Sequence, residues 1–428
     1  MLAPALLLLQ FPLTKCIRDN CFASIIAASG VSNASADATG YGYAVSNLIQ
    51  TVKARTALGF IANNDGGGAK SEERSEPPVA SKVTLALARK FGATFTPWVQ
   101  LLFDDLLDFS DFFILNRLTD KNLIALGAAG GMQCGRYESG QDDSPMYVLS
   151  SLLFSLLSSL LTSARRRYDG RPPPGGFNKG KLHPVCGLGG DFFNSTSHLM
   201  EQTDVGQTSL AAQEAYSLAE LGKIIGKPQP LIEMLKQRGD MLSAAISINL
   251  WSEPLQVFTN QFTSNASLNP RITPTSFYPL AHAKAATDAQ AAATVARWLT
   301  NASHFCVAVD GQPRCDDAAY YGLPSAERSD SAFPVGYWRG NVWGPQAQLA
   351  YWALQERDDV PVVKAARKAL AAQMEELFLS QWQRHAHVCE NYNPSKHALS
   401  SGGDCTGTQY YHWGALTGVL SLMEDDIW

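Results

Sequence analysis

Residues 209–226 read SLAAQEAYSLAELGKIIG, and this stretch decides the fold class. Its apolar residues recur at spacings of three and four, which is the period of a helix with one buried face. The stretch closes on Gly226, and glycine favours the left-handed backbone that commonly ends a helix. We therefore predict an amphipathic helix here.

Helical periodicity continues along most of the chain, and segments with the alternating pattern of strands are few. Further helices are predicted at residues 43–58, 78–91, 98–116, 230–251, 281–299, 345–356, 362–382 and 410–423. Long loops that carry the polar and aromatic motifs separate these helices. This pattern is typical of an α/α toroid, in which paired helices form two rings and loops at one end build a pocket.

The composition is that of an ordinary globular protein. With 428 residues, 46% of them apolar and 17% charged, the chain is long enough for one large core or two domains. The net charge of −5 and the lack of a basic stripe argue against a nucleic-acid partner. No cysteine or histidine spacing is typical of a zinc site, and no glycine-rich loop carries the lysine of a phosphate cradle.

Two segments break the helical pattern. Residues 1–15 form an apolar leader, which is either a short secretory signal or a truncated start. Residues 148–161 are rich in leucine and serine but, at 14 residues, are too short for a membrane span. A basic stretch rich in proline and glycine follows them. We therefore interpret residues 148–190 as an insertion without a function of its own and predict no membrane association.

Cysteines and glycosylation sequons favour a secretory route only weakly. Cys306 and Cys315 flank a polar turn, and Cys389 and Cys405 flank a loop rich in serine and glycine; both spacings suit local disulfides. Glycosylation sequons occur at Asn33, Asn194, Asn265 and Asn301, and chance alone would give a similar number in a chain of this length. Localisation stays open between the secretory pathway or extracellular space and the cytoplasm. Nothing in the sequence sets the oligomeric state.

An aromatic stretch, YWRGNVWGP at residues 337–345, is the most informative loop motif. A flat apolar ring beside a guanidinium fork suits a sugar, which has C–H faces and hydroxyl edges. The alternative is a buried aromatic knot where a loop enters the helix predicted from residue 345. The motif by itself leaves both interpretations open.

A first acidic motif, ESGQDDSPMY, spans residues 138–147. Its three carboxylates, Glu138, Asp142 and Asp143, lie in a predicted loop without a neighbouring cation. Crowded carboxylates raise one another's pKa, and a general acid working near neutral pH needs such a shift. The alternative is a solvated acidic turn.

A second motif, HAHVCENYNP at residues 385–394, follows a long predicted helix and places Glu390 where the loop leaves it. Its two histidines alternate and lack a third ligand nearby, so no metal site is predicted. Two carboxylates far apart in sequence, with an aromatic and arginine motif between them, are the minimum set for glycoside hydrolysis. In inverting enzymes they face each other across a gap of roughly 6.5–9.5 Å.

With these motifs together, the chain resembles glycoside hydrolase family 63 and its relatives, which include processing α-glucosidases and hydrolases of mannosylglycerate and glucosylglycerate. It is more distantly similar to trehalases. The order and spacing of the motifs hold from about residue 16 to the end. The matching stretches are residues 18–20, 73–78, 138–147, 204–209, 275–280, 337–345, 387–394 and 411–415.

The resemblance implies an (α/α)6 barrel over residues 16–428 and an inverting mechanism on an α-linked glucoside or mannoside. It places the general acid at Asp142 and the general base at Glu390. Two carboxylates and water suffice for this chemistry, so no cofactor or metal is implied. The substrate-binding residues that it implies are Arg18, Asp19, Arg74, Tyr337, Trp338, Arg339, Trp343 and Trp413.

The chain departs from the family pattern in the acid loop. Gln141 stands where the family usually has a bulky apolar residue, and Asp143 stands where it usually has asparagine. Directly after this loop come the 43 residues of the segment 148–190, which the family lacks. Aromatic-rich sequence expected ahead of residue 18 is replaced by the leucine-rich leader.

Three functions remain as hypotheses. The leading one is hydrolysis of a glycosylglycerate or short oligosaccharide, because the chain has no room for the large N-terminal β domain of the processing α-glucosidases. The second is a mannosyl-oligosaccharide glucosidase that acts on N-glycans, which the sequons and cysteine pairs favour. The third is a carbohydrate-binding pseudoenzyme, which the altered acid loop and the insertion favour.

Overall fold

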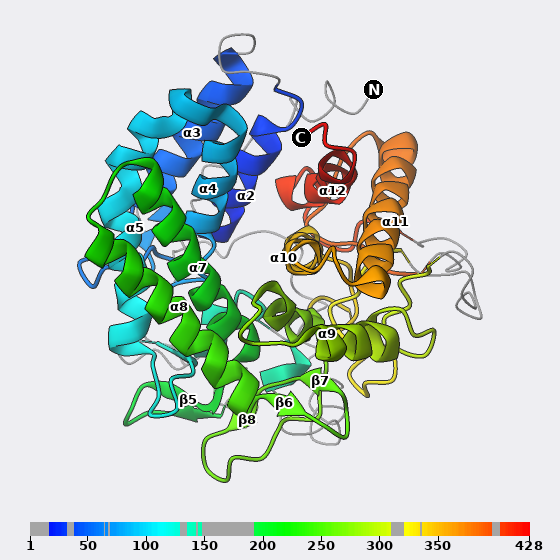
Figure 1. Ribbon diagram of the computed structural model, residues 1–428. Helices are drawn as coiled ribbons and strands as arrows, with labels where there is room; N and C mark the ends of the chain where they lie inside the picture. Colours follow the sequence, from blue (N-terminus) through cyan, green and yellow to red (C-terminus); the bar gives the residue numbers. More distant parts are fainter. Residues whose placement is uncertain are drawn as a thin grey trace.

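The computed structural model describes residues 17–31, 38–63, 65–66, 69–128, 135–142, 144–147, 192–309, 321–333, 336–395 and 403–428. The leader at residues 1–15 and the insertion at residues 148–190 lie outside the described residues. The described chain is mostly helical, as the periodicity predicted, and Figure 1 shows helices over most of the molecule, with the labelled strands toward the bottom of the view. None of these helices is both long and apolar enough to cross a bilayer.

Six helical elements follow one another around a closed cycle of contacts, each packing on the next and the last returning to the first. In chain order they are α2 (Ile17–Ala28), α4 (Ala80–Phe91), α7 (Val205–Ile224), η4 (Pro274–Ala281), α10 (Gly344–Gln355) and α12 (Leu416–Glu424). Burial agrees with an inner position, since every residue of α10 from Gly344 to Leu354 is buried. At the closure, Trp428 Nε1 donates a hydrogen bond to the Ile25 carbonyl oxygen at 3.3 Å.

Further helices cover this cycle from outside (Figure 1). They are α3 (Ala38–Lys53) against α2, α5 (Thr96–Asn116) and α8 (Gln229–Asn249) against α7, and α11 (Pro361–His385) against α10 and α12. α9 (Asp288–Thr294) continues into a π-helical turn, η5 (Val295–Leu299), which packs on α11. These helices alternate buried and exposed positions, and the exposed face of α8 includes an apolar residue, Ile248, which is 80% exposed.

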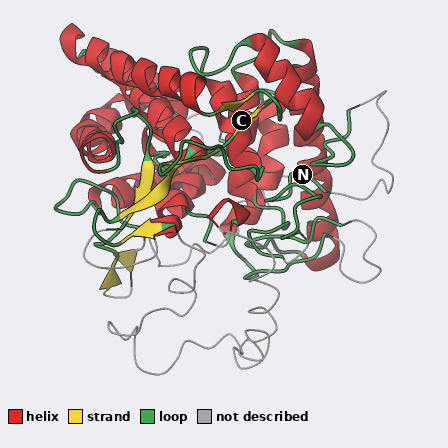
Figure 2. Cartoon of the chain, turned by 90° about the horizontal axis from the view of Figure 1, so that it is seen from below, coloured by secondary structure: helices red, strands yellow, loops and turns green. Residues whose placement is uncertain are grey.

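Strands are short and few among the described residues (Figure 2). One antiparallel sheet joins β3 (Ala125–Gly127), β4 (Phe193–Asn194) and β8 (Gln261–Phe262) to β5 (Leu199–Thr203). Two-residue hairpins pair β1 (Asp65–Gly66) with β2 (Ala69–Lys70), and β6 (Trp251–Ser252) with β7 (Val257–Phe258). β5 leads directly into α7, so the sheet fixes where that inner helix begins.

The predicted helices are present, but α2 was not predicted and three predictions need correction. The helix predicted at residues 43–58 runs from Ala38 to Lys53. Residues 281–299 do not form one helix: η4 ends at Ala281, and α9 starts only after Thr287. Thr287 and Gln290 form a capping box, which satisfies the first amides of α9 and sets its start. The helix predicted from residue 410 begins later, as the short turn η6 (His412–Ala415) that leads into α12.

One buried carboxylate links two inner helices. Glu214 of α7 is 0% exposed and accepts hydrogen bonds from Ser81, at 3.0 Å from the backbone nitrogen and 2.6 Å from the hydroxyl. Val79, the residue before α4, offers no side-chain cap, so Glu214 satisfies the start of α4 from the neighbouring helix. Burial raises the pKa of Glu214 to about 7, against the lowering effect of the Ser81 hydrogen bonds.

Candidate active site

The aromatic stretch forms a buried cluster at the start of α10. The Trp338 and Trp343 rings stack with centroids 3.6 Å apart, and Trp413 packs edge-on to Trp343 at 5.5 Å. All three indoles are at most 5% exposed. The stretch therefore forms a buried aromatic knot where a loop enters a helix, which was the alternative to a sugar site, with Trp343 as the residue that precedes α10.

Tyr337 is the member of the stretch that combines partial exposure with an uncommon backbone. Its φ of 56° lies in the left-handed region, which an aromatic residue rarely adopts. The ring packs edge-on to Trp343 at 5.1 Å and remains partly exposed. Uncommon backbone conformations of this kind gather at functional sites, where the surroundings hold them in place.

The segment with Glu390 pairs directly with the aromatic stretch. Val342 and Tyr392 exchange two backbone hydrogen bonds of 2.9 and 3.0 Å. Beside them the Asn341 amide nitrogen donates to the Asn391 side-chain oxygen at 2.7 Å. These contacts fix the backbone on both sides of Glu390 relative to the start of α10.

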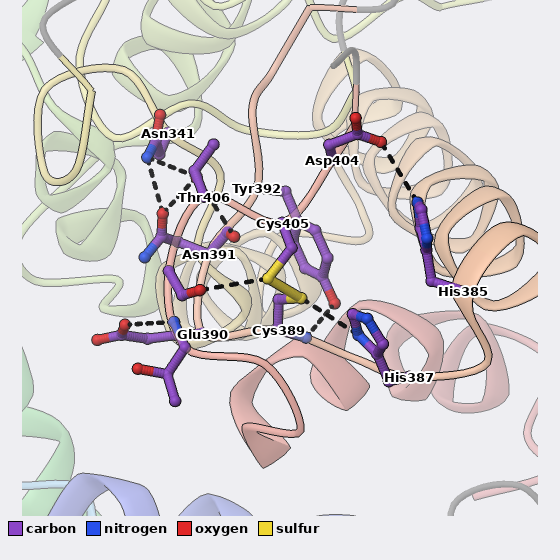
Figure 3. The surroundings of a disulfide bond; sticks show 12 residues. Asn341, His385, His387, Cys389, Glu390, Asn391, Tyr392, Asp404, Cys405 and Thr406 are labelled. Atoms are coloured by element: carbon purple, nitrogen blue, oxygen red, sulfur yellow. Dashed lines mark hydrogen bonds and ion pairs between the residues drawn. A yellow bond between two sulfur atoms is a disulfide. The ribbon is translucent and has the colours of Figure 1, made fainter. Parts of the chain in front are cut away.

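A disulfide and a second strand-like segment hold Glu390 from the other side (Figure 3). The disulfide joins Cys389 and Cys405, which confirms the pairing that the sequence favoured. Cys306 is also disulfide-bonded, and Cys315 lies outside the described residues. Glu390 donates its backbone N–H to the Thr408 carbonyl oxygen at 2.9 Å and accepts the Thr408 N–H on its carboxylate at 3.1 Å.

The approach of this second segment requires a glycine. A Cβ on Gly407 would lie 2.6 Å from a Glu390 carboxylate oxygen and closer still to the Asn391 amide nitrogen. Only a residue without a side chain lets the backbone pass so close. The Glu390 carboxylate, which is half-buried, points away from the disulfide in Figure 3.

The two histidines of this motif face away from Glu390. His387 Nδ1 lies 3.5 Å from the Cys389 sulfur, and His385 Nε2 lies 3.7 Å from an Asp404 oxygen (Figure 3). Within the described part of the chain, no group of three or more histidine, cysteine or carboxylate side chains is arranged to hold a metal ion.

In the acid loop, Glu138 is paired with a cation, contrary to the prediction from the sequence. The loop was expected to lack a neighbouring cation, but the Arg117 guanidinium grips Glu138 through two nitrogens, at 2.7 and 3.0 Å. The same carboxylate accepts the Gly127 N–H at 2.8 Å and the Ser75 hydroxyl at 3.3 Å. Glu138 is fully buried and therefore anchors the loop rather than crowding Asp142. Arg117 follows the end of α5, and no local signal in the sequence points to this contact.

Asp142 lies in a turn that this anchor supports. Gln141, just before it, donates its backbone N–H to the Ser139 hydroxyl at 3.0 Å and accepts the Ser144 N–H at 3.0 Å. The Asp142 side chain is half-buried. Asp143 lies outside the described residues.

A cavity brings several predicted motifs together at the starts of inner helices. Gln207 lines it from α7 and Gln346 from α10, while Gln141 comes from the acid loop. The further lining residues are Pro77, Ser139, Tyr147, Asp204, Gly206, Leu210, Thr275, Tyr278 and Leu349. Motifs that lie between residues 73 and 349 in the sequence thus share one cavity.

Asp204 is a structural group in this cavity. Its carboxylate caps α7 by accepting the Gln207 N–H at 2.6 Å, and it accepts the Tyr147 hydroxyl at 2.7 Å and the Asn260 amide at 3.2 Å. Burial raises its pKa, and the Gln207 hydrogen bond opposes that shift. Residues 204–209 matched a family motif, but this match did not indicate the structural role of Asp204. An aspartate directly before a helical run is a known helix-start signal.

The remaining residues that were predicted to bind substrate lie in different parts of the structure. The Arg74 guanidinium lies 5.3 Å above the Tyr137 ring of the acid loop and pairs with Glu73 at 2.7 Å. Arg339 is 2% exposed. Arg18 and Asp19 belong to the first turn of α2, and their side chains lie outside the described part of the chain.

Comparison with known proteins identifies the family. Residues 36–414 match the family described as the mannosylglycerate hydrolase MGH1-like glycoside hydrolase domain. The chain belongs to this family. It is accordingly a glycoside hydrolase, and the resemblance predicted from the motifs is confirmed. No curated protein sequence matches the chain significantly.

Solved structures share the fold at low sequence identity. The family 63 mannosylglycerate hydrolase of Thermus thermophilus in complex with glucose has a TM-score of 0.63 at 17% identity, covering 96% of this chain and 93% of that one. Its complex with Tris and D-glycerate has a TM-score of 0.64 at 18% identity, covering 94% and 92%. A neutral trehalase from Saccharomyces cerevisiae has a TM-score of 0.61 at 16% identity, covering 96% and 71%.

Proposed function

We propose that this glycoside hydrolase cleaves an α-linked glucoside or mannoside with inversion, on an (α/α)6 barrel whose inner ring is the closed cycle of six helical elements. Asp142 is the general acid and Glu390 is the general base. The observation that carries the proposal is the start of α10, where Val342 pairs with the Glu390 segment and Gln346 faces the cavity beside the acid loop.

The reaction needs only these two carboxyl groups and water. Asp142 gives its proton to the glycosidic oxygen, and the bond from this oxygen to the anomeric carbon breaks. Glu390 removes a proton from a water molecule, whose oxygen bonds to the anomeric carbon from the opposite face. An α-linked substrate therefore releases a β-anomer first.

For the substrate, we propose a glycosylglycerate or a short α-linked oligosaccharide. Support comes from the family description and from the T. thermophilus structures, which are named mannosylglycerate hydrolases. A second candidate is a glucosylated N-glycan. The confirmed Cys389–Cys405 disulfide favours it, because structural disulfides persist mainly in oxidising compartments, through which N-glycoproteins pass.

The test is sugar release from glucosylglycerate, mannosylglycerate, trehalose, kojibiose, nigerose and a glucosylated N-glycan, with product anomers followed by NMR. Asp142→Asn and Glu390→Gln are the paired variants. We expect a β-anomer first from one substrate and its loss in both variants. An α-anomer appearing first would refute inversion. Sugar binding without turnover on the whole panel would support the pseudoenzyme instead.

A further inference from the structure

Two glutamine side chains in the cavity have amide groups without partners. Gln346 is 1% exposed, and neither its amide nitrogen nor its amide oxygen has a hydrogen-bond partner among the described residues. Gln141 is 4% exposed, and its amide oxygen likewise has none in the described part of the chain. Both side chains line the same cavity.

Such groups are uncommon, because a buried amide that gives up water without gaining another partner destabilises the fold. Two of the neighbouring polar side chains of the cavity, Asp204 and Gln207, are already hydrogen-bonded. Asp204 accepts three hydrogen bonds, one of them from the Tyr147 hydroxyl, and Gln207 donates its side-chain nitrogen to the Glu138 carbonyl oxygen at 3.5 Å. The Gln346 amide and the Gln141 amide oxygen are therefore available to bind a ligand in this cavity.

The lining also restricts the charge of that partner. None of the described residues that line the cavity is lysine or arginine, and the one charged group, Asp204, is an acid. A carboxylate would meet no cation here and would be repelled. A hydroxyl group both donates and accepts, so it matches an amide that offers a donor and an acceptor. The free space is about 10 Å³, which fits a hydroxyl group or one water molecule.

We propose that Gln141 and Gln346 form a hydroxyl-recognition subsite that selects a neutral hexopyranose beside the acid loop. A sugar hydroxyl takes the place of a water molecule and bonds the Gln346 amide and the Gln141 oxygen. The inference rests on the proposed function, because it assigns this subsite to the cleaved sugar and not to a charged aglycone. Gln141 precedes Asp142 directly, so an occupied subsite also holds the acid loop in place.

The sequence supports a specific role for Gln141. In the family that the motifs resemble, this position usually carries a bulky apolar residue, which offers no hydrogen bond. The glutamine adds a second amide to the lining of the cavity, beside that of Gln346 from α10. A polar residue at both positions makes recognition of a hydroxyl possible from two sides.

The test compares Gln346→Leu and Gln141→Leu with the wild type. Leucine is of similar size and removes the donors and acceptors. Gln348→Leu is the matched control: Gln348 is also buried and lies on α10, but it does not line the cavity. Calorimetry would measure the binding of D-glucose, D-mannose, their monodeoxy derivatives and D-glycerate, with melting temperatures for every variant.

We expect a hexose to bind the wild type and the Gln348→Leu control equally, and to bind Gln346→Leu about tenfold or more weakly, as the loss of one or two hydrogen bonds predicts. One monodeoxy sugar should show the same loss with the wild type and no further loss with Gln346→Leu. D-glycerate binding should not depend on Gln346. The Gln346→Leu melting temperature should not fall, because two unpaired buried groups are removed.

Equal hexose binding by wild type and Gln346→Leu, or no hexose binding by the wild type, would overturn the subsite. The proposed function has a separate outcome. If nothing on the substrate panel is hydrolysed while hexose binding depends on Gln346, the subsite stands and the hydrolytic proposal fails. If hydrolysis proceeds with the same kcat/KM in Gln346→Leu and wild type, the subsite fails and the hydrolytic proposal stands.

Discussion

Replacing Glu214 with glutamine should remove much of the pH dependence of stability between pH 5 and pH 8. The carboxyl group is fully buried between α7 and α4, and its pKa is raised from 4.5 to about 7. A folded-state pKa above the unfolded one means that the folded protein holds this proton more tightly. The stabilisation is therefore complete below about pH 4.5 and is lost as the pH rises through about 7.

The magnitude follows from the two pKa values. A difference between about 7 and 4.5, at roughly 1.4 kcal/mol for each pKa unit, corresponds to about 3.5 kcal/mol. Urea unfolding at pH 5 and pH 8 measures it. The wild type should lose on the order of 2–3 kcal/mol more than Glu214→Gln over this range, because glutamine carries no titrating proton. Glu72→Gln, at an exposed carboxylate, is the control and should match the wild type.

Two opposing effects make this test decisive. Burial disfavours the ionised carboxylate, whereas the Ser81 hydrogen bonds and the positive end of the α4 dipole favour it. If the wild type instead gains stability relative to Glu214→Gln as the pH rises, the helix start outweighs burial. The reasoning from desolvation would then be wrong.

Two further predictions concern the segments that carry the proposed acid and base. Glu138→Gln should lower the free energy of unfolding by about 3–5 kcal/mol, because it leaves the Arg117 guanidinium buried beside a neutral group. Urea unfolding would measure this loss, and a loss below about 1 kcal/mol would contradict the prediction. Replacing Cys389 and Cys405 together with serine should cost about 3 kcal/mol for a loop of this length, measured against the oxidised wild type with its disulfide intact. The same double variant should lower kcat more than it changes KM, because the disulfide holds Glu390 in position. An unchanged kcat would show that the disulfide does not position Glu390 for catalysis.

Most helices except α2 were predictable because their apolar residues recur in the sequence at helical spacing. α7, α8 and α11 follow the predicted stretches to within a few residues. The prediction failed between residues 281 and 299, where apolar residues continue at helical spacing across a break. That break is set by the capping box at Thr287, a local signal that prevails over the apolar periodicity.

The site was predictable in its local parts and not in its long-range contacts. Spacing alone suited the Cys389–Cys405 disulfide, whereas it left the aromatic stretch open between a buried knot and a sugar site. The Arg117–Glu138 pair joins the end of one helix to a loop, and only the tertiary fold shows that these groups meet. Gln346 drew no attention because a glutamine in the first turn of a helix is usually solvated, and its burial follows from the inner position of α10.

The closure of the helical cycle has a consequence for synthesis of the chain. α2 buries Phe22, Ile25 and Ile26, yet one of its neighbours, α12, is nearly 400 residues away. At about 5–20 residues per second, a ribosome needs on the order of 20–80 seconds to travel from one to the other. During that interval the first inner helix lacks its final partner, and nascent chains should depend on chaperones that shield apolar helices near the N-terminus.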